Sequence, residues 1–146
     1  PAQREPQVGG TAAEALLPEH QVLGPNLAAD LICHEADMRE ALGLPRVARE
    51  HWQSFLDVMM LFLWKQMRHT ATLLIRDEQG QQWTCGSGKP TTLLRADGYE
   101  LLRATYSRRS QRQIAAWNWT PTPPRHVIER FGFFGPRDDD QPVPAL

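Results

Sequence analysis

The sequence predicts an α+β fold, in which two helices come first and a small sheet with short helices follows. Apolar residues recur at helical spacing over residues 26–42 and 46–68, and from residue 70 the pattern changes to short strand-like runs. Because no long helices separate these runs, the pattern excludes an alternating βαβ fold. The 146 residues are enough for one core and too few for two full-sized domains.

The first helix is predicted over residues 26–42, with Asn26 as its N-cap. One apolar stripe is expected along it, formed by Leu27, Leu31, Met38 and Leu42. Gly43 and Pro45 end the helix, since glycine adopts the left-handed conformation and proline cannot continue a helix. Residues 1–25 contain repeated proline and glycine and are predicted to be a loop or connector.

The second helix is predicted over residues 46–68. Its apolar residues occupy almost the whole circumference between Phe55 and Trp64, where Asp57 is the only interruption. Such a helix is expected to be central and covered on more than one side. Together the two helices, within residues 26–69, resemble a remnant of a helical bundle.

A short antiparallel sheet is predicted next. The runs Thr70–Asp77 and Gln81–Gly86 flank a turn in which Gly80 supplies a positive φ angle, as in a β-hairpin. Thr91–Arg95 is a third strand. Three short helices are then expected, at Tyr99–Tyr106, Ser110–Ala116 and Pro124–Phe131.

Asp97 and Ser110 are the predicted caps of the first two of these short helices. The small α+β domain therefore spans residues 70–137, and residues 138–146 are expected to be a frayed tail.

Composition excludes several classes of protein. Sixteen basic and seventeen acidic residues give a net charge of −1, which argues against a nucleic-acid partner. The longest strongly apolar run, Val58–Trp64, is far shorter than the roughly 20 residues of a membrane span. No signal peptide is evident, and Cys33 and Cys85 are too few for a disulfide framework. A cytoplasmic protein without a membrane partner is expected.

The most distinctive group of polar residues is Asp30, His34 and Asp37. Residues four apart lie on one face of a helix, so Asp30 and His34 are candidate ligands of one divalent metal. Asp37 is a candidate support that accepts the other N–H of His34. Two ligands hold a metal poorly, and the alternative is two ordinary polar residues on an exposed face. Third-ligand candidates without supporting spacing are His20, His51, His69 and His126.

Two further sets of residues are weaker candidates for a functional role. Arg108 and Arg109 are candidates for contacting a carboxylate of a cofactor. The favoured alternative is ion pairing with Glu100 and Asp97 between helices. Both cysteines are expected to be buried packing residues, and a bond between them is compatible with the sequence but not required by it.

Two runs resemble a known family. The run Leu31–Gly43 (LICHEADMREALG) is similar to the last helix of the metal-binding bundle in the mycothiol-dependent maleylpyruvate isomerase family, part of the DinB-like superfamily. The run Arg95–Ser110, followed by Gln113, Trp117 and residues 134–137 (FGPR), looks like the small C-terminal domain of that family. Together the matches bracket residues 26–137.

The resemblance implies a divalent metal, usually zinc, held by Asp30, His34 and a histidine from an earlier helix, with Asp37 in support. It implies that a thiol such as mycothiol is activated there for isomerisation or transfer on a small electrophile. Three features depart from the family: Asp30 stands where Glu is common, Ser107 replaces a glycine, and the earlier helices have no counterpart in the sequence.

Three readings therefore remain open. The chain is the metal-bearing part of such an isomerase or transferase, completed by an N-terminal segment or a partner chain. Alternatively, it is a non-catalytic binding or accessory module. As a fragment, it would expose the apolar stripe of its first helix, which favours a homodimer.

Overall fold

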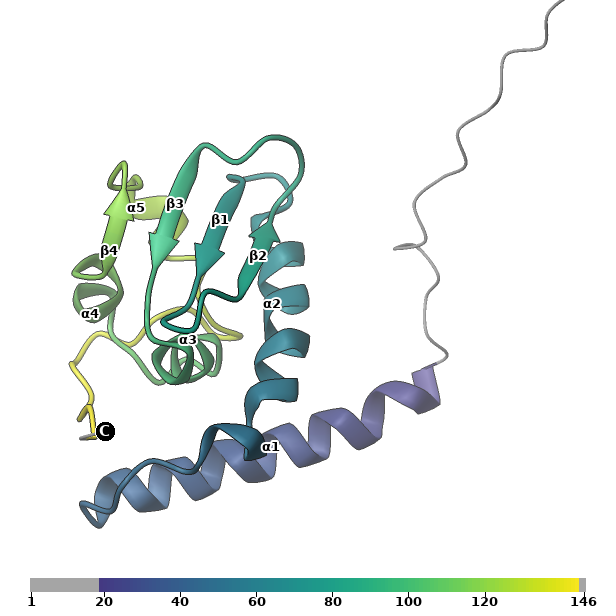
Figure 1. Ribbon diagram of the computed structural model, residues 1–146, viewed down its shortest axis with the longest axis vertical. Coiled ribbons are helices and arrows are strands. Elements are labelled where there is room, and N and C mark those ends of the chain that lie inside the picture. The colour runs from purple at the N-terminus through teal and green to yellow at the C-terminus, as the bar shows by residue number, and fades with distance from the viewer. Residues whose placement is uncertain (1–18, 145–146) are drawn as a thin grey trace, which may run out of the picture.

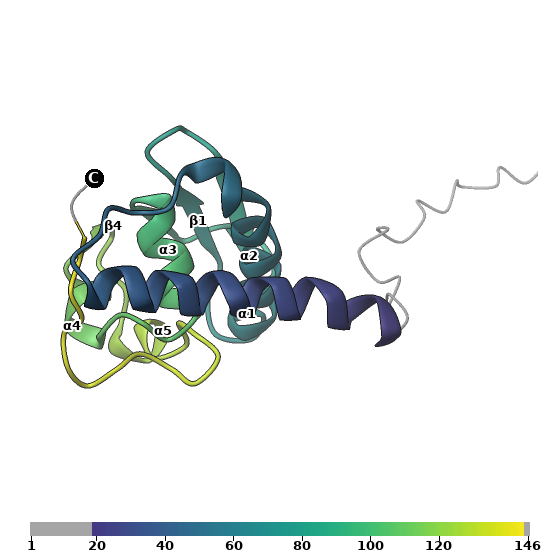
Figure 2. The same cartoon turned by 90° about the horizontal axis from the view of Figure 1, so that it is seen from below.

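The structure, a computed structural model, describes residues 19–144, with the side chains of the first helix from Leu27 onward. It has the predicted α+β class: five α-helices, one 3-10 turn and a four-stranded sheet within these residues. Helix α1 (Glu19–Ala41) lies across one end of the molecule, and its first turns extend beyond the other elements (Figures 1 and 2).

Helix α1 begins seven residues before the predicted N-cap Asn26. The prediction of a loop up to residue 25 is wrong for residues 19–25, because the helix continues through Gly24 and Pro25. A proline costs an interior helix one hydrogen bond but does not always end it. The rest of that predicted loop, residues 1–18, lies outside the described residues.

The second helix is shorter than predicted. Extended chain and the 3-10 turn η2 (Arg49–His51) precede α2 (Gln53–Met67). The guanidinium groups of Arg46 and Arg49 reach acidic side chains beyond the helix, and this pairing holds the preceding segment in its non-helical path. The buried face of α2 is formed by Leu56, Met59, Met60, Leu63 and Met67.

Helix α2 is covered by more than one element, as expected, but not around its whole circumference. Val58 and Leu61 are exposed, whereas α2 packs on β2 and on α3 (Gly98–Thr105) with its opposite face. An apolar residue on an exposed helix face is common in proteins, so the apolar run alone did not distinguish the two situations.

The hairpin is confirmed. Strands β1 (Leu73–Arg76) and β2 (Gln82–Cys85) pair antiparallel, and Gly80 has a φ angle of 84° in the turn between them. The side chain of Asp77 accepts hydrogen bonds from the backbone of Gln79 and Gln81, which fixes the turn.

The sheet is mixed rather than antiparallel. Strand β3 (Thr92–Arg95) pairs parallel with β1, and β4 (Asn118–Thr120), which was not predicted, pairs antiparallel with β3. The order is therefore β2-β1-β3-β4. A parallel pair needs a crossover connection of a dozen or more residues, and here β2 and its flanking loops provide it.

One face of the sheet contributes to the core. Leu73, Ile75 and Leu94 are completely buried, whereas the alternate residues Leu74 and Leu93 are partly exposed. This alternation is the two-residue period of a strand with one covered face. Helix α2 contributes its five buried residues to the same core.

The short helices have the predicted caps. The Asp97 side chain accepts a hydrogen bond from the Glu100 backbone at the start of α3, and Ser110 forms a capping box with Gln113 at α4 (Gln111–Ala115). Helix α5 (Arg125–Ile128) falls inside the third predicted helical segment.

Between α3 and α4, Ser107 has a φ angle of 59°, the left-handed conformation that glycine adopts most easily. A glycine would adopt this conformation with less strain than serine does.

The expected fraying of the tail is wrong for residues 138–141. Asp140 accepts a hydrogen bond from Ser110 Oγ and pairs with Arg112, and Gln141 exchanges hydrogen bonds with the Gln113 side chain. Among residues 19–144, no helix is long and apolar enough to cross a membrane.

Candidate functional site on helix α1

Helix α1 contacts the rest of the molecule through small residues. Ala29, Cys33 and Ala36 recur at spacings of four and three and are buried. Arg103 of α3 reaches this face of α1 and donates a hydrogen bond to the backbone carbonyl of Cys33 over 3.1 Å.

The opposite face of α1 carries large apolar residues. The apolar stripe is formed by Leu27, Leu31, Met38 and Leu42, which are 70%, 69%, 60% and 72% exposed. Figure 2 shows α1 in front of α2 and α3, with no other described element between it and the viewer. The predicted stripe therefore exists, but it faces away from the core.

Asp30 and His34 lie on this uncovered side and converge. The Oδ1 atom of Asp30 is 3.5 Å from Nε2 of His34, and both side chains are more than half exposed. This is the arrangement that the four-residue spacing predicts. Neither side chain is committed to a buried ion pair.

Asp37 stands behind the imidazole. Its Oδ2 atom is 3.6 Å from Nδ1 of His34, which is an ion-pair distance rather than a hydrogen bond. Two guanidinium groups hold the carboxylate in place: Arg103 contacts Oδ1 at 2.5 Å, and Arg108 contacts both oxygens at 3.1–3.2 Å. Asp37 thus lies beside His34, but it does not accept the predicted hydrogen bond from the imidazole.

These contacts also lower the pKa of Asp37. Partial burial alone would raise the pKa of this carboxyl, but the hydrogen bonds from Arg108 and Arg103 outweigh burial and lower it below 3.8. A carboxyl with a lowered pKa in the folded state contributes stability above its unfolded pKa, and this stability is lost as the pH falls through the folded value.

The substitution Asp37→Asn is therefore expected to destabilise the protein most at pH 7, with a difference that shrinks below about pH 4. Urea unfolding of both proteins at pH 7, 5 and 3 measures it. A difference that stays constant over this range would contradict the assignment of charge to Asp37.

Arg103 and Arg109 form a buried ion-pair network with Glu40 and Glu100. Arg103 donates hydrogen bonds to both carboxylate oxygens of Glu40 at 3.0 Å. Arg109 donates to Glu100 at 2.5 and 2.8 Å and to Glu40 at 3.2 Å. Arg109 is completely buried, so its guanidinium does not face a ligand, and Arg108 pairs with Asp37. The contacts support ion pairing rather than a cofactor role for the two arginines.

Glu40 is the member of this network that sequence reasoning missed. It lies seven residues after Cys33, on the inward side of α1. An acidic residue on the small-residue face was the available signal, because a buried carboxylate requires a cationic partner.

Tyr106 lies near Cys33 and Asp30. Cys33 is buried and free, and burial raises the pKa of its thiol although Arg103 and Arg108 lower it. Burial also raises the pKa of Tyr106, with contributions from Cys33 and Asp30. Within the described residues the Tyr106 hydroxyl is buried without a hydrogen-bond partner. Cys85 is free as well, and burial raises its pKa to about 12.

None of the candidate third ligands whose side chains the structure describes joins Asp30 and His34. Among the described side chains, no group of three or more His, Cys, Asp or Glu could hold a metal ion. His51, His69 and His126 are exposed. The side chain of His20 lies outside the described part of the chain.

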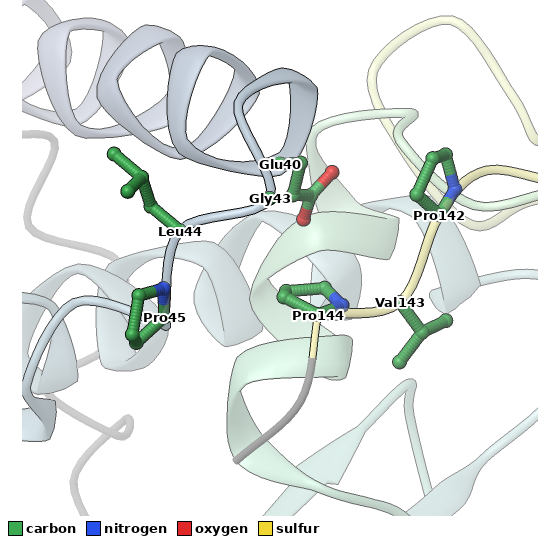
Figure 3. A pocket seen from close by; sticks show the side chains of 7 residues that line it. All are labelled: Glu40, Gly43, Leu44, Pro45, Pro142, Val143 and Pro144. Atoms are coloured by element: carbon green, nitrogen blue, oxygen red, sulfur yellow. The ribbon is translucent and has the colours of Figure 1, made fainter.

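A hollow lies between the end of α1 and the C-terminal segment (Figure 3). It is lined by Glu40, Gly43, Leu44, Pro45, Pro142, Val143 and Pro144. Glu40 is its only charged residue, and this carboxylate already accepts hydrogen bonds from Arg103 and Arg109. The hollow therefore offers no uncommitted charge for a polar substrate.

Comparison of the chain with protein-family models, with curated proteins and with solved structures gave no match.

Proposed function

We propose that Asp30 and His34 are half of a divalent-metal site, and that the protein uses this site in thiol-dependent isomerisation or transfer on a small electrophile. The observation that carries the metal half of this proposal is the 3.5 Å between Asp30 Oδ1 and His34 Nε2. Two donors of a tetrahedral zinc site, each about 2.0–2.1 Å from the metal, lie about 3.3 Å apart.

The chemistry of the Asp30 and His34 side chains also fits a zinc ion. A carboxylate and an imidazole are common zinc ligands, and a carboxylate behind the imidazole favours the tautomer whose Nε2 binds metal. Asp37 Oδ2 lies 3.6 Å from His34 Nδ1, and Arg103 and Arg108 pair with its carboxylate. The remaining donors are not among the described side chains of the same chain.

A bound metal would supply deprotonation of a coordinated thiol near neutral pH. Asp30 and His34 would hold the group, and Asp37 would keep the imidazole oriented. The thiol part of the proposal, and mycothiol as the thiol, depend on the family resemblance.

Excess Zn²⁺ is expected to raise the melting temperature of the full chain in a thermal shift measurement. Ligand at 100 times its Kd stabilises a protein by about 2.7 kcal/mol. Asp30→Ala and His34→Ala should each remove this shift, whereas His126→Ala, which removes an exposed histidine elsewhere, should keep it. An equal shift in all four proteins would contradict the metal site.

Cobalt(II) tests the thiol part separately. A low-molecular-weight thiol added to the cobalt-loaded chain should produce a sulfur-to-cobalt charge-transfer band, and His34→Ala should abolish the band. Cobalt binding without any such band would contradict thiol activation while leaving the metal site in place.

The exposed apolar stripe favours a second candidate, a non-catalytic binding module. Four large apolar side chains on one uncovered helix face are typical of an interaction surface. Metal binding that depends on Asp30 and His34 distinguishes the two functions, because a purely apolar docking surface does not require it.

A further inference from the structure

We infer that the uncovered face of α1 binds the same face of a second copy of this chain, and that the two Asp30–His34 pairs together form one four-donor metal site. The inference rests on the proposed metal half-site and names the partner that completes it.

The first observation is the spacing along α1. Leu27, Leu31, His34 and Met38 follow one another at intervals of four, three and four residues, and all are more than half exposed. This is the pattern of a helix that packs lengthwise against another helix. His34, the proposed metal ligand, thus lies in line with three residues of the apolar stripe.

The second observation is that this pattern is its own complement in an antiparallel pair. A register that sets Leu27 against Met38 of the second copy also sets Leu31 against His34 of the second copy. Its twofold axis passes between positions 32 and 33. An interface between identical surfaces requires such self-complementarity.

The third observation is where that axis falls. The axis lies between the two helices, level with the turn of α1 that separates Asp30 from His34. The register that sets Leu27 against Met38 and Leu31 against His34 therefore brings two aspartates and two histidines around one point. Four is the ligand number of tetrahedral zinc, and each chain supplies two of the four donors at 3.5 Å from one another.

Metal and pairing are expected to be linked. Without a cation, the two Asp30 carboxylates approach each other near the axis, and like charges that close are unfavourable. The contact is also narrow: residues 27–42 of one helix extend over only about 24 Å. We therefore expect a weak dimer without metal and a stable one with it.

The test measures mass and metal content of the full chain by sedimentation velocity and elemental analysis, with EDTA or with stoichiometric Zn²⁺. The expected result is a monomer in EDTA and a dimer with one zinc per two chains. His34→Ala and Leu31→Glu should each weaken the zinc-dependent dimer by about tenfold or more. Val58→Glu, at an exposed apolar position of α2 away from the stripe, is the matched control and should leave the dimer unchanged.

Other outcomes overturn the inference in distinguishable ways. A monomer that binds one zinc through Asp30 and His34 would refute the second copy but leave the proposed function standing, with donors supplied by another segment or another protein. A dimer whose stability changes neither with zinc nor with His34→Ala would refute the shared site. If the chain binds no zinc that depends on Asp30 and His34, the proposed function is refuted as well. Circular dichroism of each variant shows that it remains folded.

Discussion

Replacing Arg103 with methionine is expected to destabilise the protein by about 3–5 kcal/mol, the range found when one partner of a buried ion pair is removed. Arg103 is 2% exposed and donates hydrogen bonds to Glu40, to Asp37 and to the backbone carbonyl of Cys33. Methionine keeps much of the volume but none of the donors. The Glu40 carboxylate would remain buried with only Arg109 and the Tyr99 hydroxyl to bind it.

Arg112→Met is the matched control. Arg112 also pairs with a carboxylate, that of Asp140, but its side chain is 83% exposed. Exposed ion pairs contribute little to stability, because water and salt screen them. Urea unfolding at pH 7 measures both variants. Similar losses for Arg103→Met and Arg112→Met would contradict a structural role for the buried network.

Arg103→Met should also affect the proposed metal ligands Asp30 and His34. Arg103 holds both α1 and Asp37, and Asp37 lies behind His34. We therefore expect Arg103→Met to weaken zinc binding even at temperatures where the variant is fully folded. Removal of an outer support of a metal ligand typically costs about 10–100-fold in affinity.

Local signals predicted much of this fold. The caps Asp97 and Ser110 are side chains that bind the first backbone amides of the helix they precede, so the sequence alone places them. Gly80 marks the hairpin turn for an equally local reason. The Asp30–His34 pair was predictable because four residues make about one helical turn.

Long-range features could not be predicted in the same way. The parallel pairing of β1 with β3 depends on which side of β1 the chain returns to, and nothing local records that choice. Strand β4 has three residues in a proline-rich segment, and it exists because Leu94 and Trp119 pair. The tail is fixed by contacts of Asp140 and Gln141 with residues about thirty positions earlier.

The most informative difference between prediction and structure is which face of α1 points toward the core. An amphipathic pattern predicts which residues share a face, but the usual assumption is that large apolar residues face the core. Here the small residues Ala29, Cys33 and Ala36 face inward, and the large ones face solvent. The preference follows from Arg103 and Arg109, because their buried guanidinium groups require the carboxylates of Asp37 and Glu40 on that side.

Replacing Gly86 with alanine is expected to cost more than about 4 kcal/mol, in the range that marks a specific structural conflict. Gly86 follows β2 with a φ angle of 108°, which a residue with a side chain rarely adopts. A Cβ atom there would also lie 2.0 Å from the carbonyl oxygen of Ala71 and 2.9 Å from Cα of Thr72. Both neighbours are backbone, so relief requires the β2 end to move away from the start of β1.

Gly88→Ala separates the two causes. Gly88 has a similar φ angle of 97°, but a Cβ atom there would meet nothing within 4 Å. Backbone strain alone should cost Gly88→Ala about 1–3 kcal/mol. The excess loss in Gly86→Ala, measured by urea unfolding, therefore reports the clash with Ala71 and Thr72. Because β1 is central in the sheet and packs against α2, this clash should lower the cooperativity of the whole domain rather than loosen one loop. Equal losses for the two glycines would show that the β2–β3 connection can shift freely, and that the close approach to β1 is not required by the fold.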